Sequence, residues 1–232
     1  MKKKKLRIPS EIAYVIGIVL LSFSVAMIAS ADFGVSMIVA PAYILSLRFD
    51  FLTFGQSEYI VQALLFLLLC LLLRRVRLPY FFSFATCLIY GAVLDLWRRI
   101  IPLFNPDITP PGSMRFPLRC VLLGVGMLLT AFSVALFYRT YLYPQVYDFF
   151  VKAVCERYAL DRTKFKICFD AGSLAIASAM TLLFFRRFNG IGVGTLIMTG
   201  CNGVLIGLFG KMFDRFCAFP ALFPKAEARF RI

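Results

Sequence analysis

The sequence contains no histidine among its 232 residues. This absence excludes histidine proton relays, Ser–His catalytic triads and histidine-ligated metal sites. Its seven cysteines, at 70, 87, 120, 155, 168, 201 and 217, are scattered without any CxxC spacing. An odd, dispersed set within apolar runs indicates packing residues in a reducing environment rather than a disulfide framework. With no nucleophile–base set either, we expect neither an enzyme nor a bound cofactor or metal.

Charge is also scarce, at 16% of residues, whereas 61% are hydrophobic and the mean hydropathy is +0.83. Soluble domains are about 45–50% apolar. Because the excess lies in long runs, the sequence predicts an integral membrane protein whose main partner is the lipid bilayer. At this length we expect one membrane domain, 1–232, without a sizeable soluble one.

The charges that are present are mostly basic, with 26 Lys and Arg against 12 Asp and Glu. They fall at junctions between apolar runs, such as "MKKKKLR", "RRVR", "FRRF" and the C-terminal tail. This is the positive-inside pattern, so no nucleic-acid partner is expected. The first apolar run has about eighteen residues, longer than the 7–15 of a signal peptide. We therefore predict a retained first span, with both termini cytoplasmic.

Six runs are long enough to cross a bilayer, and two segments are not. The predicted spans are Ile12–Ser30, Gln56–Leu73, Tyr80–Ile101, Phe116–Tyr138, Phe165–Phe185 and Gly190–Met212. The short segments are Ser36–Leu47 and Pro144–Ala159. As a helix, the fifteen uncharged residues between Asp32 and Arg48 extend about 22 Å, less than the roughly 30 Å hydrocarbon core.

Four features recur in the same order at offsets of 109 to 112, which predicts an internal duplication. They are "FSVA" at 23–26 and 132–135, a short segment after each copy, paired arginines at 74–75 and 186–187, and "GAVLDLW" at 91–97 against "GVLIGLF" at 203–209. We place repeat 1 at about 12–104, a loop at 105–115, repeat 2 at about 116–212 and a cytoplasmic tail at 213–232.

The predicted fold is thus an all-α polytopic membrane protein of two tandem repeats, each with three spanning helices and one short or half helix. If the short segments do not cross, there are six spans and the repeats are inverted. If they cross, there are eight spans and the repeats are parallel. The distribution of Lys and Arg does not separate these alternatives, because both place most of them inside.

The motifs "DFGVSMIVAPAYILSL", "LTFGQSEYIVQ", "KFKICFD" and "GIGVGTLIMTGCNGVLIGLF" resemble the YczE/YyaS/YitT-like family of bacterial integral membrane proteins. The likeness extends from about residue 14 to 212. It implies a multi-pass protein of the bacterial plasma membrane, sometimes supposed to be a transporter, with no settled substrate. The sequence departs from the family pattern at Met37, at Gln145 and at Leu208–Phe209, where a ligand could differ.

Carboxylates within apolar runs are the first candidates for a substrate or ion path. Asp170 lies about five residues into the fifth run, one helical turn after Lys166. Either an interfacial ion pair or an acidic group lining a path would explain the two residues. Asp95 lies at the far end of the third run, where Arg98 and Arg99 offer partners, and is open to the same two interpretations.

Three further polar positions remain open between structural and functional roles. Asp32 is expected to cap the helix that starts near Ser36, or to coordinate a ligand there. Gln62 matches Asp170 at an offset of 108, and either an interhelical hydrogen bond or a pore-lining amide would explain it. Asn202 raises the same alternatives.

The second short segment carries Asp148, Lys152 and Glu156, four residues apart and alternating in sign. Such a stripe requires protein cover, a cavity or the membrane surface. In the last span, Gly203 and Gly207 predict close helix packing.

Short helices at matching positions of two halves are typical of transporter binding sites. The helices that start at Ser36 and Pro144 would then present the backbone N–H groups of their first turns to an anionic group. Two helices lying along the membrane surface are the structural alternative. The sequence therefore favours a secondary transporter or permease for a small solute or ion. A non-transporting membrane scaffold or assembly partner is the alternative, and a homo-oligomer is compatible with both.

Overall fold

The computed structural model describes residues 5–74, 78–142 and 145–223. Within these ranges the elements are β1 (Leu6–Arg7), α1 (Ser10–Ala31), α2 (Ala40–Arg48), α3 (Phe54–Leu73), α4 (Leu78–Ile100), the 3₁₀ helix η1 (Pro102–Phe104), α5 (Phe116–Phe137), α6 (Val146–Tyr158), α7 (Arg162–Phe185), α8 (Val193–Phe216) and β2 (Cys217–Ala218).

Six of the described helices are long and apolar enough to cross a membrane, which confirms the all-α polytopic fold. They are α1, α3, α4, α5, α7 and α8. The nine residues of α2 and the thirteen of α6 extend about 14 and 20 Å. Since a bilayer core is about 30 Å thick, the six-span alternative holds and the eight-span one does not.

Most boundaries lie within a few residues of the prediction, and two differ for local reasons. The first short helix starts at Ala40 rather than Ser36, because a turn precedes it in which the Ser36 carbonyl accepts from Val39 and Ala40. The last helix extends to Phe216 rather than Met212. The tail predicted at 213–232 therefore begins as the last turn of this helix, and β2 follows it.

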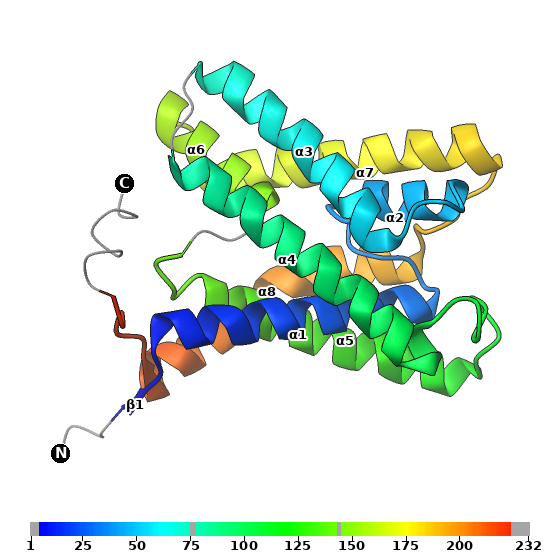
Figure 1. Ribbon diagram of the computed structural model, residues 1–232, viewed down its shortest axis with the longest axis horizontal. Helices are drawn as coiled ribbons and strands as arrows, with labels where there is room; N and C mark the ends of the chain where they lie inside the picture. Colours follow the sequence, from blue (N-terminus) through cyan, green and yellow to red (C-terminus); the bar gives the residue numbers. More distant parts are fainter. Residues whose placement is uncertain (1–4, 75–77, 143–144, 224–232) are drawn as a thin grey trace.

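The long helices pack against one another around α1 and α5, with the short helices between them (Figure 1). At the centre α1 lies against α5, with α4 beside α1 and α8 beside α5. The short α2 contacts α3 and α7, and the short α6 contacts α7 and α3. The contacts of α1 with α4 and of α2 with α3 thus have counterparts in α5 with α8 and α6 with α7, whereas the contact of α3 with α4 has no comparable one among the described residues. In Figure 1, α2 and α6 lie toward opposite ends of the molecule.

The main hydrophobic core lies between α1, α2, α4, α5 and the start of α3, around fully buried residues such as Ile44, Phe54, Tyr90 and Leu94. Large apolar side chains cover the outside as well, including Leu71, Leu183 and Val204, each more than 60% exposed. An apolar exterior of this kind suits a lipid environment rather than water. The described chain therefore has the surface of a multi-pass membrane protein.

The two ends of the described chain meet. β1 pairs in parallel with β2, with Leu6 opposite Cys217. The Glu11 carboxylate, in the first turn of α1, accepts hydrogen bonds from the backbone N–H groups of Leu222 and Phe223. The segment before α1 and the segment after α8 therefore lie at the same end of the molecule, as an even number of spans requires.

Candidate functional site

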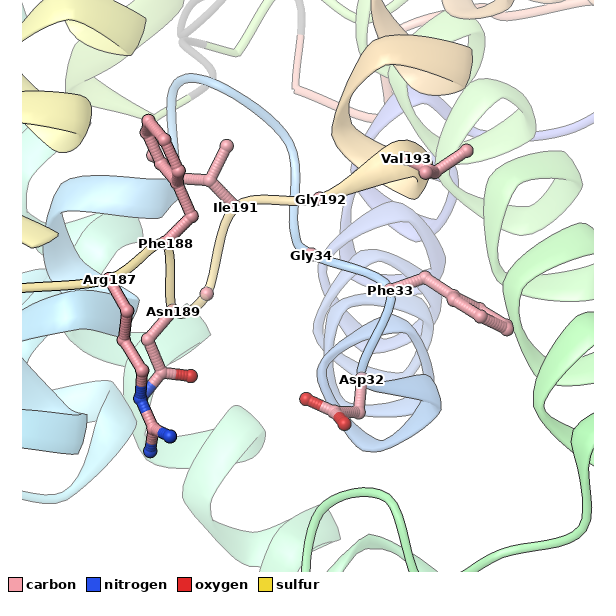
Figure 2. A pocket seen from close by; sticks show the side chains of 10 residues that line it. Asp32, Phe33, Gly34, Arg187, Phe188, Asn189, Ile191, Gly192 and Val193 are labelled. Atoms are coloured by element: carbon pink, nitrogen blue, oxygen red, sulfur yellow. The ribbon is translucent and has the colours of Figure 1, made fainter.

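Two extended segments cross between the halves of the protein. One follows α1, and the other joins α7 to α8 (Figure 2). Their contacts are Val35 N–H to Gly190 O at 3.2 Å, Gly194 N–H to Phe33 O at 2.8 Å, and Thr195 Oγ1 to Val35 O at 2.7 Å. These bonds satisfy backbone groups that would otherwise be unpaired where the helices are interrupted.

Glycine is required at the crossing point. A Cβ atom at Gly34 would lie 2.4 Å from the Gly192 nitrogen, and the φ of Gly34 is +92°. A Cβ at Gly192 would lie 2.5 Å from the Phe33 carbonyl oxygen. The two backbones therefore touch directly, and any side chain would force them apart.

A pocket of about 330 Å³ opens beside this crossing. Its lining includes backbone of the crossing segments together with the side chains of Asp32, Arg187 and Asn189. Figure 2 shows Arg187 and Asn189 on one wall and Asp32 on the other, with the space between them. The pocket thus offers a cationic and an anionic group on opposite walls, which suits a small polar solute.

Asp32 does not cap α2, contrary to one of the two expectations. It ends α1 in the left-handed conformation, with φ 54°, and forms an ion pair with Arg119 of α5 at 3.1 Å. The Arg119 guanidinium also donates to the carbonyl oxygens of Ala31 and Asp32, and it lies over the Phe33 ring. Arg119 therefore binds the backbone at the C-terminal end of α1 and orients the Asp32 carboxylate, which lines the pocket.

A second cluster of polar side chains lies around the start of α6. The Gln62 side chain, fully buried on α3, accepts from the backbone N–H of Val146 at 3.2 Å and donates to Glu58 at 2.9 Å. The Tyr147 hydroxyl donates to the same Glu58 oxygen at 2.9 Å. Of the two roles open for Gln62, the structure shows the interhelical hydrogen bond.

The short α6 begins inside the protein. Its first amide meets Gln62, the ninth of the twenty residues of α3, and near its end the Tyr158 hydroxyl donates to Leu72 O, one residue before α3 ends. Thus α6 runs from the middle of a spanning helix to its end, and its buried face packs on that helix. This is a half helix rather than a helix on the membrane surface. Pro144, the predicted start, lies outside the described residues.

Asp148, Lys166 and Asp170, predicted separately, come together. The Lys166 ammonium lies 3.6 Å from a carboxylate oxygen of Asp148 on α6 and 3.6 Å from one of Asp170 on α7. Each of the three side chains is between 22 and 33% exposed. The cluster joins α6 to α7 and stays partly open, so both interpretations of Asp170 remain compatible with it.

Two other candidates have structural surroundings. Asp95 accepts from Thr53 Oγ1 at 2.5 Å and from the Gly55 amide at 2.8 Å. Its hydrogen-bond partners thus lie at the start of α3, rather than at Arg98 and Arg99, which the sequence offered as partners. The α3 helix thus has a carboxylate cap from α4. On α8, the buried Asn202 Oδ1 has no hydrogen-bond partner among the described residues.

The prediction that Gly203 and Gly207 pack closely is wrong within the described chain. A Cβ at either position would meet nothing within 4 Å. The tight helix contact lies instead between Gly55 and Gly91, where the Cβ of an alanine at 55 would come within 2.2 Å of the Gly91 oxygen. Spacing alone does not show which face of a helix meets a neighbour.

Glu58 is the site residue that the sequence interpretation missed, together with Arg119, Tyr147 and Arg187. A signal was present, because Glu58 precedes Gln62 by one helical turn at the start of an apolar run. Among the residues that the structure describes, no three His, Cys, Asp or Glu side chains lie close enough together to hold a metal ion.

Comparison with known proteins gives a family but no function. A model described as "Family of unknown function (DUF6198)" matches residues 8–211. No curated protein and no solved structure matches the chain. Since the match covers nearly all of the crossing segments and helices described above, the chain belongs to this family of unknown function, DUF6198.

Proposed function

We propose that this protein is a secondary transporter or permease for a small polar solute, which enters through the pocket at the crossing segments. One observation carries the proposal: two short helices, one from each half of the chain, have buried first turns and lie toward opposite ends of the protein (Figure 1). Interrupted helices in matching positions are the arrangement that transporters use to bind solutes away from lipid.

An internal duplication supports this proposal. Three of the four helix pairs start at nearly constant intervals: Ser10 to Phe116 is 106 residues, Ala40 to Val146 is 106 and Phe54 to Arg162 is 108. The fourth pair, α4 and α8, starts at Leu78 and Val193, an interval of 115. Both α3 and α7 end at a left-handed arginine, Arg74 and Arg186. With three spans in each half, the second copy is inverted relative to the first, an arrangement that many secondary transporters share.

The proposed orientation places both termini in the cytoplasm of a bacterial cell, because the basic residues gather at that end. The pocket of Asp32 and Arg187 then opens at the opposite face, toward the outside. The likeness to the YczE/YyaS/YitT-like family, proposed from sequence motifs, agrees with a multi-pass protein of the bacterial plasma membrane. In this proposal the protein catalyses no reaction.

A membrane scaffold is the second candidate, and one observation favours it. Three glycines of α8, Gly200, Gly203 and Gly207, face open space and leave a smooth helix face uncovered in the described chain. Small residues of this kind permit close packing with another membrane helix. A partner protein, or a second copy, would then cover α8.

The experiment is a thermal-shift screen of the purified protein against a library of small solutes, repeated with Arg187→Gln. We expect a solute that stabilises the wild type to lose at least tenfold in affinity, because a charged contact is removed. The same solute should then be taken up by proteoliposomes. Arg186→Gln is the matched control, since Arg186 is the neighbouring arginine and does not line the pocket.

Equal affinity in Arg187→Gln and Arg186→Gln would show that the solute binds elsewhere. A solute that binds but is never taken up would favour the scaffold. Asp32→Asn is the less direct variant, because it also breaks the ion pair with Arg119.

A further inference from the structure

The cluster of polar side chains at the start of α6 contains a carboxyl group, that of Glu58, with hydrogen-bond partners for only one of its two oxygens. Glu58 is fully buried in the first turns of α3. Its Oε2 atom accepts from Gln62 Nε2 and from the Tyr147 hydroxyl, both at 2.9 Å. Its Oε1 atom is buried too, yet has no hydrogen-bond partner among the described residues.

No cation balances this carboxylate within the described chain. The ion pairs found there involve Asp32, Asp148, Asp170 and Asp214, and none involves Glu58. An ionised carboxylate with one bare oxygen would be strongly unfavourable in such a place. The neutral acid avoids that cost.

The other titratable groups around Glu58 are neutral ones. Tyr147 faces it from α6, and Tyr90 and Cys87 face it from α4. The Cys87 thiol lies 3.9 Å from the Glu58 carbonyl oxygen, and the Tyr90 side chain is hydrogen-bonded to Gln145 just before α6. Thus α3, α4 and α6 all contribute to a buried polar cluster that contains no basic side chain among the described residues.

We propose that Glu58 is a proton-binding site, with an exchangeable proton on Oε1. A proton fits better than a metal cation. Hard cations such as Mg²⁺ and Ca²⁺ take six or more oxygen ligands, whereas Oε1 has no polar neighbour within hydrogen-bonding distance. Release of the proton to water leaves a carboxylate, and uptake from water restores the acid, so the exchange needs no other reactant.

The position of Glu58 links this proton to the half helix. Gln62 connects the carboxyl group to the first amide of α6, and Tyr147, in the first turn of α6, binds the carboxyl directly. Ionisation would strengthen both hydrogen bonds and would add negative charge beside a helix N-terminus, where it is favourable. It would also require water to reach Oε1. The two protonation states therefore differ in how firmly α3 holds the start of α6.

In the transport cycle proposed above, this makes the proton the coupling ion. That role depends on the proposed function, whereas the proton site depends only on the buried geometry. The two can therefore be tested separately, and failure of one is distinguishable from failure of the other.

The proton site is tested by infrared difference spectroscopy of the purified full-length protein in lipid nanodiscs, recorded from acidic to alkaline pH. We expect the wild type to show the C=O band of a protonated carboxyl group that shifts in D₂O and disappears at high pH. Glu58→Gln should lack that band, since its amide mimics the neutral acid without a titratable proton. Glu156→Gln, on the exposed end of α6, should retain it.

Identical spectra for the wild type and Glu58→Gln would overturn the proposal, and so would a band that neither exchanges nor titrates. If Glu58→Gln does not fold, Tyr147→Phe provides the same test. This variant removes a donor to Oε2, so the wild-type band should move to higher frequency; an unmoved band would assign it to another carboxyl group and overturn the proposal.

Coupling is tested by imposing a pH gradient on proteoliposomes with a solute from the screen.

Loss of gradient-driven uptake in Glu58→Gln, with solute affinity retained, is the result expected for a coupling ion. Gradient-driven uptake that persists in this variant would overturn the coupling role.

Discussion

Several buried or partly buried polar side chains bind backbone groups where helices end. Asp95 caps α3, Gln62 caps α6, Arg119 binds the carbonyl at the end of α1, and Thr195 binds Val35 O. Helix ends leave unpaired backbone groups, and in a membrane protein water cannot satisfy them at depth. Residues that resemble ligands in the sequence are therefore structural in several cases. Glu58 differs, because one of its oxygens binds nothing in the described chain.

At the residue scale, we predict that Gly34→Ala destabilises the protein by about 3 kcal/mol or more, because a left-handed residue would also collide with backbone. Thermal unfolding in detergent measures the loss. Gly112→Ala is the matched control: its φ is also positive, at +81°, but its Cβ would meet only Asp32 Oδ2, at 3.4 Å. Equal losses in both variants would show that conformation rather than crowding determines the requirement for glycine at 34.

At the scale of elements, the short helices depend on their neighbours. Isolated helices shorter than about 12–15 residues are marginal in water, so α2 and α6 gain their stability from packing on α3 and α7. One face of α6 is buried, including Phe149 and Phe150, while the partly exposed Asp148 reaches Lys166. This explains how a charged segment can enter the protein without facing lipid.

The cap between α4 and α3 gives a prediction at this scale. Asp95→Ala removes the acceptor of Thr53 Oγ1 and of the Gly55 amide, and should lower stability by about 1–2 kcal/mol. Hydrogen exchange should rise in the first turn of α3 and remain unchanged in α5. Asp50→Ala, at an exposed residue before α3, should change stability by less than about 0.5 kcal/mol. Unchanged exchange in α3 would contradict the cap.

At the scale of the whole molecule, the two halves of the chain share some helix contacts and differ in others. α3 packs along α4, whereas the described parts of α7 and α8 make no comparable contact. The outer faces of α7 and α8 are consequently the least covered of the long helices. An incomplete symmetry of this kind leaves one side of the protein open to lipid, to a moving solute or to another chain.

Topology is the prediction for the whole molecule. With three spans per half, the loop at 105–115 must lie on the side opposite to both termini. A phosphatase fused after residue 113 should be active outside the cell, and a fluorescent protein fused after residue 223 should fluoresce inside. An inactive phosphatase at 113 would indicate four crossings before the loop, and would contradict the six-span arrangement.

Much of this architecture can be read from the sequence. Long apolar runs determine where spans lie, because about twenty residues are needed to cross lipid, and a proline-rich loop near the middle marks the division of the chain. The two short segments are visible for the same reason, since each apolar stretch is too brief to cross. Local composition is sufficient for these conclusions because hydrophobic length is a property of consecutive residues.

Which polar groups meet was decided only by the tertiary structure. Asp32 pairs with Arg119, 87 residues away, and Glu58 binds Tyr147, 89 residues away. Helical spacing identifies neighbours within one helix, such as Lys166 and Asp170, but carries no information on which faces of two helices touch. The sequence by itself therefore determined the number and kind of helices. Packing between distant segments decided that two backbones cross at glycines and that one carboxyl group remains buried without a full set of partners.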